Sequence, residues 1–235
     1  MSYVVSPPSQ PSVPVAGGAP GARYPVHRIY CVGRNYVDHA IEMGASGREA
    51  PFFFMKPPDA ILPVLEGQTG RMHYPSLTQD LHHEVELVVA IGKGGRDIPA
   101  EQAMAHVWGY AVGLDMTRRD LQGAAKKMGR PWSTGKGFDE SAPISPVRPA
   151  DQCYLNSAAQ IALDVNGAPR QHSVIGKMIW SVSEIIEQLS SAWALQPGDL
   201  IFTGTPEGVG AVNVGDELHA RIDGVGSLKI EIVNR

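Results

Sequence analysis

The chain has 235 residues, of which 43% are hydrophobic and 19% are charged, a composition typical of a water-soluble protein with one large core. The formal net charge of −4 and the pI of about 6.0 argue against a basic surface for nucleic acid. The sequence contains no run of roughly 18 apolar residues, and its N-terminus lacks the pattern of a signal peptide. Cys31 and Cys153 have no metal-ligand or redox spacing, so we expect two reduced thiols in a cytoplasmic protein.

Proline, glycine and serine dominate residues 1–24, which include the stretch SPPSQPSVPVAGGAPG. Such a composition buries little apolar surface and favours extended conformations. We therefore expect residues 1–24 to form a flexible arm, either a free tail or a strap over a neighbour. Residues 25–235 are expected to form one folded domain.

A short helix is predicted after the strand at residues 27–32, with Asn35 as its N-cap and Gly44 at its end. His39 and Glu42 are then three residues apart and share a face of the helix. A carboxylate at this spacing can orient an imidazole and raise its basicity, as a catalytic base requires. The alternative is a solvated surface pair, and the spacing alone favours that alternative.

Two acidic residues interrupt the apolar stretch HHEVELVVAI at residues 82–91, which has the composition of a β-strand. Successive strand residues point to opposite faces, so Glu84 and Glu86 share one face and Val85 and Leu87 share the other. Two adjacent carboxylates repel each other, and a hard cation such as Mg²⁺ or Mn²⁺ relieves that repulsion. The alternative is a solvent-facing strand edge, and this stretch alone does not decide between them.

The next predicted strand, at residues 107–114, ends at Asp115, a position where loops often carry ligand-binding groups. Residues 117–120 fit the capping-box pattern and predict the start of a helix. On that helix Arg119 and Gln122 fall one turn apart.

The remainder of the chain is predicted to consist mostly of strands. Lys136 lies between two glycines in a polar stretch that lacks the phosphate-binding loop pattern. Hairpin turns are indicated at Asn166-Gly167 and Asp223-Gly224, and Ser181 with Glu184 forms a capping box before an apolar helical stripe. Many strands with few helices predict a β-rich α+β fold.

Eight segments occur in an order that resembles the fumarylacetoacetate hydrolase superfamily over residues 27–233. They are GRNYVDHAIEMG, FFFMKPPDAI, HHEVELVVAIGK, WGYAVGLDMTRRDLQ, STGKGFDESAPISP, VNG, LQPGDLIFTGTPEGVG and VGDELHARIDGVGSL. The resemblance is to the small single-domain branch of acylpyruvate and fumarylpyruvate hydrolases. It implies a mixed β-roll or barrel with a few short helices, one divalent cation per chain and a homodimer.

The resemblance also implies a role for each matched side chain. The implied metal ligands are Glu84, Glu86 and Asp115; the catalytic residues are His39, Glu42 and Lys136; the substrate-binding residues are Gln122, Thr205, Arg34 and Arg119. Arg34 and Arg119 have the alternative of serving as structural ion-pair partners. The family does not use His82 or His83 as metal ligands, and a ligand set of oxygen atoms suits Mg²⁺ or Mn²⁺ better than Zn²⁺.

The implied activity is metal-dependent hydrolysis of the C–C bond of a 2,4-diketo acid. Fumarylpyruvate, cleaved to fumarate and pyruvate in gentisate catabolism, is the preferred substrate. Charge complementarity suggests that Arg34, Lys126, Lys127 or Arg130 would meet its distal carboxylate, and the alternative is a solvated basic loop. The alternatives are an oxaloacetate decarboxylase or another lyase, isomerase or hydratase of the same family. A more remote alternative is a non-catalytic metal-binding module.

Overall fold

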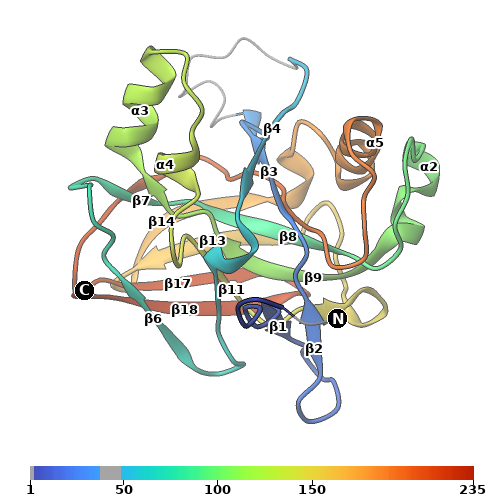
Figure 1. Cartoon of the computed structure of the whole chain (residues 1–235), viewed down its shortest axis with the longest axis horizontal. Helices are drawn as coiled ribbons and strands as arrows, with labels where there is room; N and C mark the ends of the chain where they lie inside the picture. The colour runs from blue at the N-terminus through green and yellow to red at the C-terminus, as the bar shows by residue number, and fades with distance from the viewer. Residues whose placement is uncertain (1–2, 38–48) are drawn as a thin grey trace.

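Curved sheets form most of this computed structural model, which describes residues 3–37 and 49–235 (Figure 1). The largest sheet has eight strands, in the order β4-β3-β15-β8-β9-β11-β5, with β12 paired to β9. Its strands are β3 (Ile29–Gly33), β4 (Phe52–Lys56), β5 (Ile61–Pro63), β8 (Val85–Ile91), β9 (Val107–Leu114), β11 (Ala142–Ile144), β12 (Arg148–Pro149) and β15 (Leu200–Phe202). This architecture confirms the predicted β-rich α+β class.

A five-stranded sheet packs against the large one, in the order β14-β13-β17-β18-β6. Its strands are β6 (Thr69–His73), β13 (Gln160–Val165), β14 (Ala168–Val174), β17 (Glu217–Ile222) and β18 (Gly226–Val233). A three-stranded sheet comprises β7 (Leu81–His83), β10 (Thr117–Arg118) and β16 (Gly210–Val212), and a two-stranded one comprises β1 (Ser12–Pro14) and β2 (Arg23–Pro25).

Short helices lie along one side of the curled sheets, opposite β6, β17 and β18 (Figure 1). They are α2 (Ala100–Ala103), α3 (Arg119–Lys127), α4 (Ser133–Lys136) and α5 (Val182–Ala192). The described residues also form the 3₁₀ turns η1 (Pro58–Ala60), η2 (Met104–His106), η3 (Ala150–Gln152) and η4 (Ile175–Lys177). None of the helices in the described part of the chain is long and apolar enough to cross a membrane.

Both faces of β8 are buried, which excludes the solvent-facing edge as an explanation of Glu86 and of Glu84 directly before the strand. Val85 and Leu87 belong to the main hydrophobic core, which extends into the five-stranded sheet. Val88, on the opposite face, belongs to a second core cluster with residues of β3 and β15. The alternation predicted from the sequence is therefore confirmed, and the face with Glu84 and Glu86 is enclosed by protein.

The two predicted capping boxes have different outcomes. At α5, the Ser181 hydroxyl accepts a hydrogen bond from the Glu184 backbone N–H and the Ser181 N–H donates to the Glu184 carboxylate, as predicted. Helix α3 begins where expected, but it has no side-chain cap. The Thr117 hydroxyl instead lies 3.2 Å from Glu84 Oε1 and 3.1 Å from the Asp115 carbonyl oxygen.

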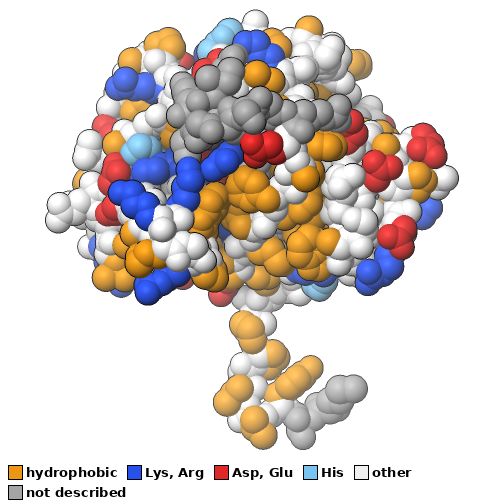
Figure 2. Space-filling view, turned by 90° about the horizontal axis from the view of Figure 1, so that it is seen from above, with side chains coloured by type: hydrophobic (Ala, Val, Ile, Leu, Met, Phe, Trp, Pro, Cys, Tyr) orange, Lys and Arg blue, Asp and Glu red, His pale blue; other side chains and the backbone are white. Residues whose placement is uncertain are grey.

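Part of the N-terminal segment, residues 12–16, packs against the folded domain of the same chain. Strands β1 and β2 pair, and the side chain of Val13 is fully buried in the second core cluster. The Ala16 N–H donates to the Val147 carbonyl, which ties the hairpin to the body. Residues 3–9 are exposed, and the N-terminal end of the chain extends away from the body of the molecule (Figure 2), whereas Gln10 Nε2 donates to the Val26 carbonyl at 2.6 Å. The domain boundary near residue 24 stays a prediction.

Candidate active site

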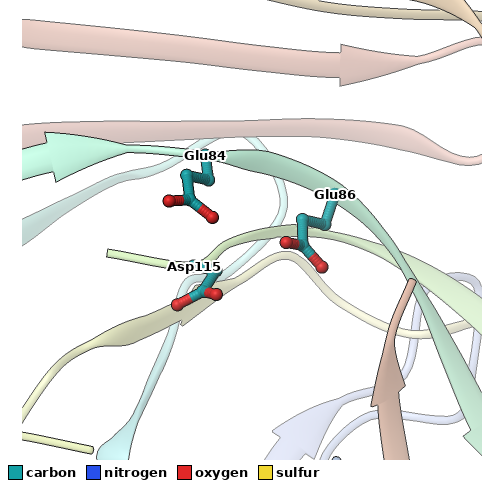
Figure 3. A group of neighbouring side chains, drawn as sticks. All are labelled: Glu84, Glu86 and Asp115. Carbon is teal, nitrogen blue, oxygen red and sulfur yellow. The ribbon is translucent and has the colours of Figure 1, made fainter. Parts of the chain in front are cut away.

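Three carboxylates converge where β8 and β9 meet. Glu84 occupies the break between β7 and β8, and Asp115 follows β9 directly. Because β8 and β9 are antiparallel, with Val85 opposite Leu114, their ends bring these two residues together, and the Asp115 N–H donates to the Glu84 carbonyl at 2.8 Å. One oxygen each from Glu84, Glu86 and Asp115 lies within 4.8 Å of the others (Figure 3).

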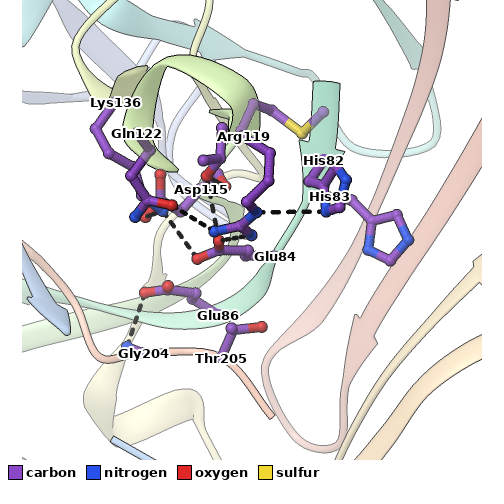
Figure 4. Close-up of polar contacts among 12 residues, drawn as sticks. His82, His83, Glu84, Glu86, Asp115, Arg119, Gln122, Lys136, Gly204 and Thr205 are labelled. Atoms are coloured by element: carbon purple, nitrogen blue, oxygen red, sulfur yellow. Dashed lines mark hydrogen bonds and ion pairs between the residues drawn. The ribbon is translucent and has the colours of Figure 1, made fainter. Parts of the chain in front are cut away.

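Burying these carboxylates without a cation costs free energy, because their negative charges are removed from water and repel one another. The three residues are only 6%, 2% and 1% exposed, in chain order. Burial, followed by the charges of Asp115 and Glu84, raises the pKa of Glu86 well above its usual range. Glu86 Oε2 accepts the Gly204 N–H at 2.8 Å (Figure 4). No cationic side chain within residues 3–37 and 49–235 forms an ion pair with Glu86, whereas Glu84 and Asp115 each do. A buried set of oxygen donors that includes one carboxyl group without a cationic partner among the described residues fits a divalent cation such as Mg²⁺ or Mn²⁺.

Lys136, at the end of α4, reaches the same carboxylates. Its Nζ lies 2.9 Å from Glu84 Oε2 and 2.7 Å from Asp115 Oδ2. Burial lowers the pKa of Lys136, but the charges of Asp115 and Glu84 outweigh burial and raise it overall. Lys136 is therefore a protonated donor next to the cluster, as its predicted role requires.

Lys56 is a second buried cation that the sequence analysis missed. It ends β4 and is 1% exposed, and its Nζ lies 2.7 Å from Asp115 Oδ1. The same Nζ donates to the carbonyl oxygens of Met116 and Lys136. Lys56 thus holds both the Asp115 carboxylate and the backbone of Lys136. Its only sequence signal is a lysine that directly ends an apolar strand.

Arg119 is held by an ion pair with a carboxylate of the cluster. One terminal nitrogen of its guanidinium bonds Glu84 Oε1, and the other donates to Gln122 Oε1 at 2.6 Å (Figure 4). Its Nε lies 3.4 Å from His82 Nδ1. Of the two alternatives for Arg119, this geometry favours the structural ion pair. Gln122, with its Oε1 occupied, retains its amide N–H groups for the cavity that it lines.

A small cavity in front of the cluster has an aromatic wall. It is lined by Val32, Gly33, Arg34, Phe52, Phe54, Glu84, Glu86, Asp115, Arg119, Gln122, Trp132, Lys136 and Thr205. The rings of Phe52 and Phe54 lie 5.4 and 5.7 Å from that of Trp132. The Arg34 guanidinium carbon lies 5.7 Å from the Phe52 ring centre, and Arg34 Nε has no hydrogen-bond partner among the described residues.

The cavity brings together nearly all of the predicted residues. The three metal ligands, Lys136 and the four substrate-binding candidates all line it. His39 and Glu42 lie outside the described residues. Lys126, Lys127 and Arg130 are solvent-exposed and do not line the cavity, so Arg34 is the one candidate for the distal carboxylate that does.

The two histidines beside the cluster do not face it. His83 is fully buried and points away from the carboxylates, with its Nδ1 3.0 Å from Gln171 Oε1 (Figure 4). Burial lowers the pKa of His83 to about 4, so its imidazole is neutral near pH 7. His82 Nε2 pairs with Asp80 at 2.8 Å. The expectation that neither histidine is a metal ligand agrees with these positions.

The fold and the acidic cluster define a metal-binding member of an enzyme family. Residues 28–233 match the model of the fumarylacetoacetate hydrolase C-terminal family, and the chain belongs to that family. It is 54% identical to the fumarylpyruvate hydrolase of Pseudomonas aeruginosa, whose crystal structure contains Mn²⁺ and pyruvate; the match covers 100% of both chains with a TM-score of 0.96.

Two curated relatives carry different activities. A fumarylpyruvate hydrolase of a Ralstonia species is 47% identical over 78% of this chain and 93% of its own. A mitochondrial oxaloacetate tautomerase of Rattus norvegicus is 45% identical over 87% of this chain and 90% of its own. Both similarities cover most of the fold.

Proposed function

We propose that this protein is a metal-dependent hydrolase that cleaves the C–C bond of a 2,4-diketo acid, with fumarylpyruvate as substrate and fumarate and pyruvate as products. The observation that carries the proposal is the buried carboxylate cluster with Lys136 at its side, in a cavity that Gln122 and Thr205 also line. The similarity to two fumarylpyruvate hydrolases supports this choice of substrate.

Glu84, Glu86 and Asp115 are the residues that would hold the cation, because their oxygens converge and are shielded from solvent. A divalent cation bound there supplies Lewis-acid polarisation of a substrate carbonyl, worth several kcal/mol in such reactions. Lys56 and Arg119 keep the Asp115 and Glu84 carboxylates in place through buried or half-buried ion pairs.

The protein's own groups carry the proton transfers. His39, oriented by Glu42, removes a proton from the attacking water, a contribution of about 10²–10⁴-fold in rate. The water adds to the distal carbonyl of the diketo acid, and negative charge develops on that carbonyl oxygen. The Lys136 ammonium, fixed between two carboxylates, donates a hydrogen bond toward this oxygen. The carbonyl then re-forms as the C–C bond breaks, the pyruvate fragment leaves with the bonding electron pair, and the proton that His39 took from water is returned to this fragment.

Two ends of the substrate need recognition. Thr205 and the Gln122 amide would bind the carboxylate of the pyruvate end, since both line the cavity beside the acidic cluster. Arg34 would bind the distal carboxylate of the fumaryl end, because it lies on the same cavity and its Nε has no partner among the described residues. Phe52 and Trp132 would enclose the hydrocarbon between the two ends.

We further propose that the protein works as a cytoplasmic homodimer in gentisate catabolism. The two fumarylpyruvate hydrolases to which it is similar support the metabolic setting. The alternative activity is directed at oxaloacetate, as a decarboxylase or isomerase, and the oxaloacetate tautomerase relative supports it.

Product analysis separates these activities. The purified protein is stripped with chelator, reloaded with Mg²⁺ or Mn²⁺ and offered fumarylpyruvate, acetylpyruvate and oxaloacetate separately. We expect metal-dependent release of fumarate and pyruvate, fastest with fumarylpyruvate. Pyruvate and CO₂ from oxaloacetate, or its enol–keto exchange, without cleavage of either acylpyruvate would contradict the hydrolase and favour the alternative.

A further inference from the structure

Gln171 links the five-stranded sheet to the cavity and has no role in the chemistry described above. It lies on β14 and is 1% exposed. Its Oε1 accepts the Val85 N–H at 3.0 Å and lies 3.0 Å from His83 Nδ1. Its Nε2 donates to Thr205 Oγ1 and to the Pro206 carbonyl, both at 2.8 Å. One buried side chain therefore uses two acceptor and two donor positions.

The orientation of this amide is determined by its neighbours. The Val85 N–H can only donate and the Pro206 carbonyl can only accept, so the oxygen and nitrogen of Gln171 cannot exchange places. His83 must then hold its proton on Nδ1 to donate to the Gln171 oxygen. Hydrogen bonds therefore run in one direction, from His83 through Gln171 to the Thr205 hydroxyl.

This direction has a consequence for Thr205. A hydroxyl has one hydrogen to donate, and the Thr205 oxygen already accepts the hydrogen of Gln171 Nε2. Within residues 3–37 and 49–235 the Thr205 hydroxyl donates no hydrogen bond, and the residue lines the cavity. Its hydrogen is left for an acceptor inside the cavity.

We propose that Gln171 is a positioning residue that presents the Thr205 hydroxyl as a donor to the carboxylate of an α-keto acid, and so deepens the proposed function on which it rests. Gln171 Oε1 also accepts a hydrogen bond from the backbone N–H of Val85, which lies between the metal-ligand candidates Glu84 and Glu86. The same amide thus fixes the anion donor relative to the acidic cluster.

Pyruvate binding to the Mn²⁺-loaded protein, measured by calorimetry, tests the proposal. Thr205→Val removes the donor and should weaken the pyruvate Kd about tenfold to hundredfold, the range for one hydrogen bond to a charged group. Gln171→Glu places an acceptor against the Thr205 oxygen and captures its hydrogen, so we expect a loss of similar size. In both variants the Mn²⁺ Kd should differ from that of the wild type by less than about threefold, which is well under 1 kcal/mol.

The double variant distinguishes positioning from a general effect. If Gln171 acts through Thr205, Gln171→Glu weakens pyruvate binding less than about twofold further in the Thr205→Val protein. A full second loss there, or wild-type affinity in Gln171→Glu alone, overturns the proposal. Gln160→Glu, which adds the same charge at an exposed position of the same sheet, is the control and should bind as the wild type does.

Two further outcomes are separable. If Gln171→Glu does not fold, Gln171→Met takes its place in the same cycle, and wild-type pyruvate affinity in that variant overturns the positioning role. If the Mn²⁺-loaded wild type itself binds no pyruvate, the proposed function fails first. If the wild type binds pyruvate and the Gln171 variants bind it equally well, the proposed function stands and only the positioning role of Gln171 is refuted.

Discussion

Replacing Lys56 by methionine should destabilise the protein more than any surface charge replacement. The Lys56 ammonium is buried and bonds Asp115 Oδ1 at 2.7 Å as well as two backbone carbonyls. Methionine keeps most of the volume but leaves the Asp115 oxygen without that cation and both carbonyls without that donor. Removing one partner of a buried ion pair typically costs about 3–5 kcal/mol of unfolding free energy.

The assay is urea unfolding of the metal-free protein, with Lys93→Met as the exposed control. For a chain of this length the expected loss corresponds to a Tm decrease of roughly 6–20 °C. Addition of Mn²⁺ should restore part of the loss, because a cation on Asp115 replaces the missing positive charge. The argument that Lys56 holds Asp115 would be refuted if Lys56→Met lowered the free energy of unfolding by less than about 1 kcal/mol. It would also be refuted if Lys56→Met and Lys93→Met lowered this free energy equally.

The other predictions concern Glu86, His39 and Arg34. Glu86→Gln should abolish Mn²⁺ binding yet make the metal-free protein more stable by about 1 kcal/mol or more near pH 7, since it removes a carboxyl group whose charge is costly to bury. Because the folded-state pKa of Glu86 is raised above its usual 4.5, the wild-type metal-free protein should lose stability as pH rises through that raised value, and Glu86→Gln should flatten this slope in urea unfolding at several pH values. His39→Ala should lower kcat about 10²–10⁴-fold in steady-state assays without changing the Mn²⁺ Kd; retained activity contradicts its role as base. Arg34→Gln should raise KM for fumarylpyruvate about tenfold more than for acetylpyruvate, whereas Arg130→Gln should not; equal effects on both substrates contradict recognition of the distal carboxylate.

The acidic cluster was largely predictable because its causes are local in sequence. The period of two along residues 85–91 places Glu84 and Glu86 on one face, and Asp115 directly follows an apolar strand. What the pattern left open was whether that face meets solvent. The answer depends on side chains from distant parts of the chain, such as Val13, Tyr24 and Val147, which belong to the same core cluster as Val88.

The supporting residues were not predictable because they act across long sequence separations. Lys56 contacts Asp115 from an edge strand of the large sheet, and Gln171 contacts Thr205 from the five-stranded sheet. Thr117 was predicted from the local capping pattern to cap the helix with its hydroxyl. In the structure that hydroxyl lies against Glu84 instead. For Thr117, contact with the charged cluster outweighs the local capping preference.

The charges in the cluster also predict which substrates it favours. Glu84, Glu86 and Asp115 carry three negative charges, and the contacting cations Lys56, Lys136 and Arg119 carry three positive ones. A divalent cation therefore leaves an excess of two positive charges in the cluster, and Arg34 on the same cavity adds a third, so a substrate with two carboxylates is attracted more strongly than a monocarboxylate. We expect kcat/KM for fumarylpyruvate to fall more steeply with ionic strength than kcat/KM for acetylpyruvate, because the larger charge product is screened more strongly. Parallel slopes between about 0.01 and 0.15 M salt would refute charge complementarity as the source of selectivity and leave the shape of the aromatic wall to explain it.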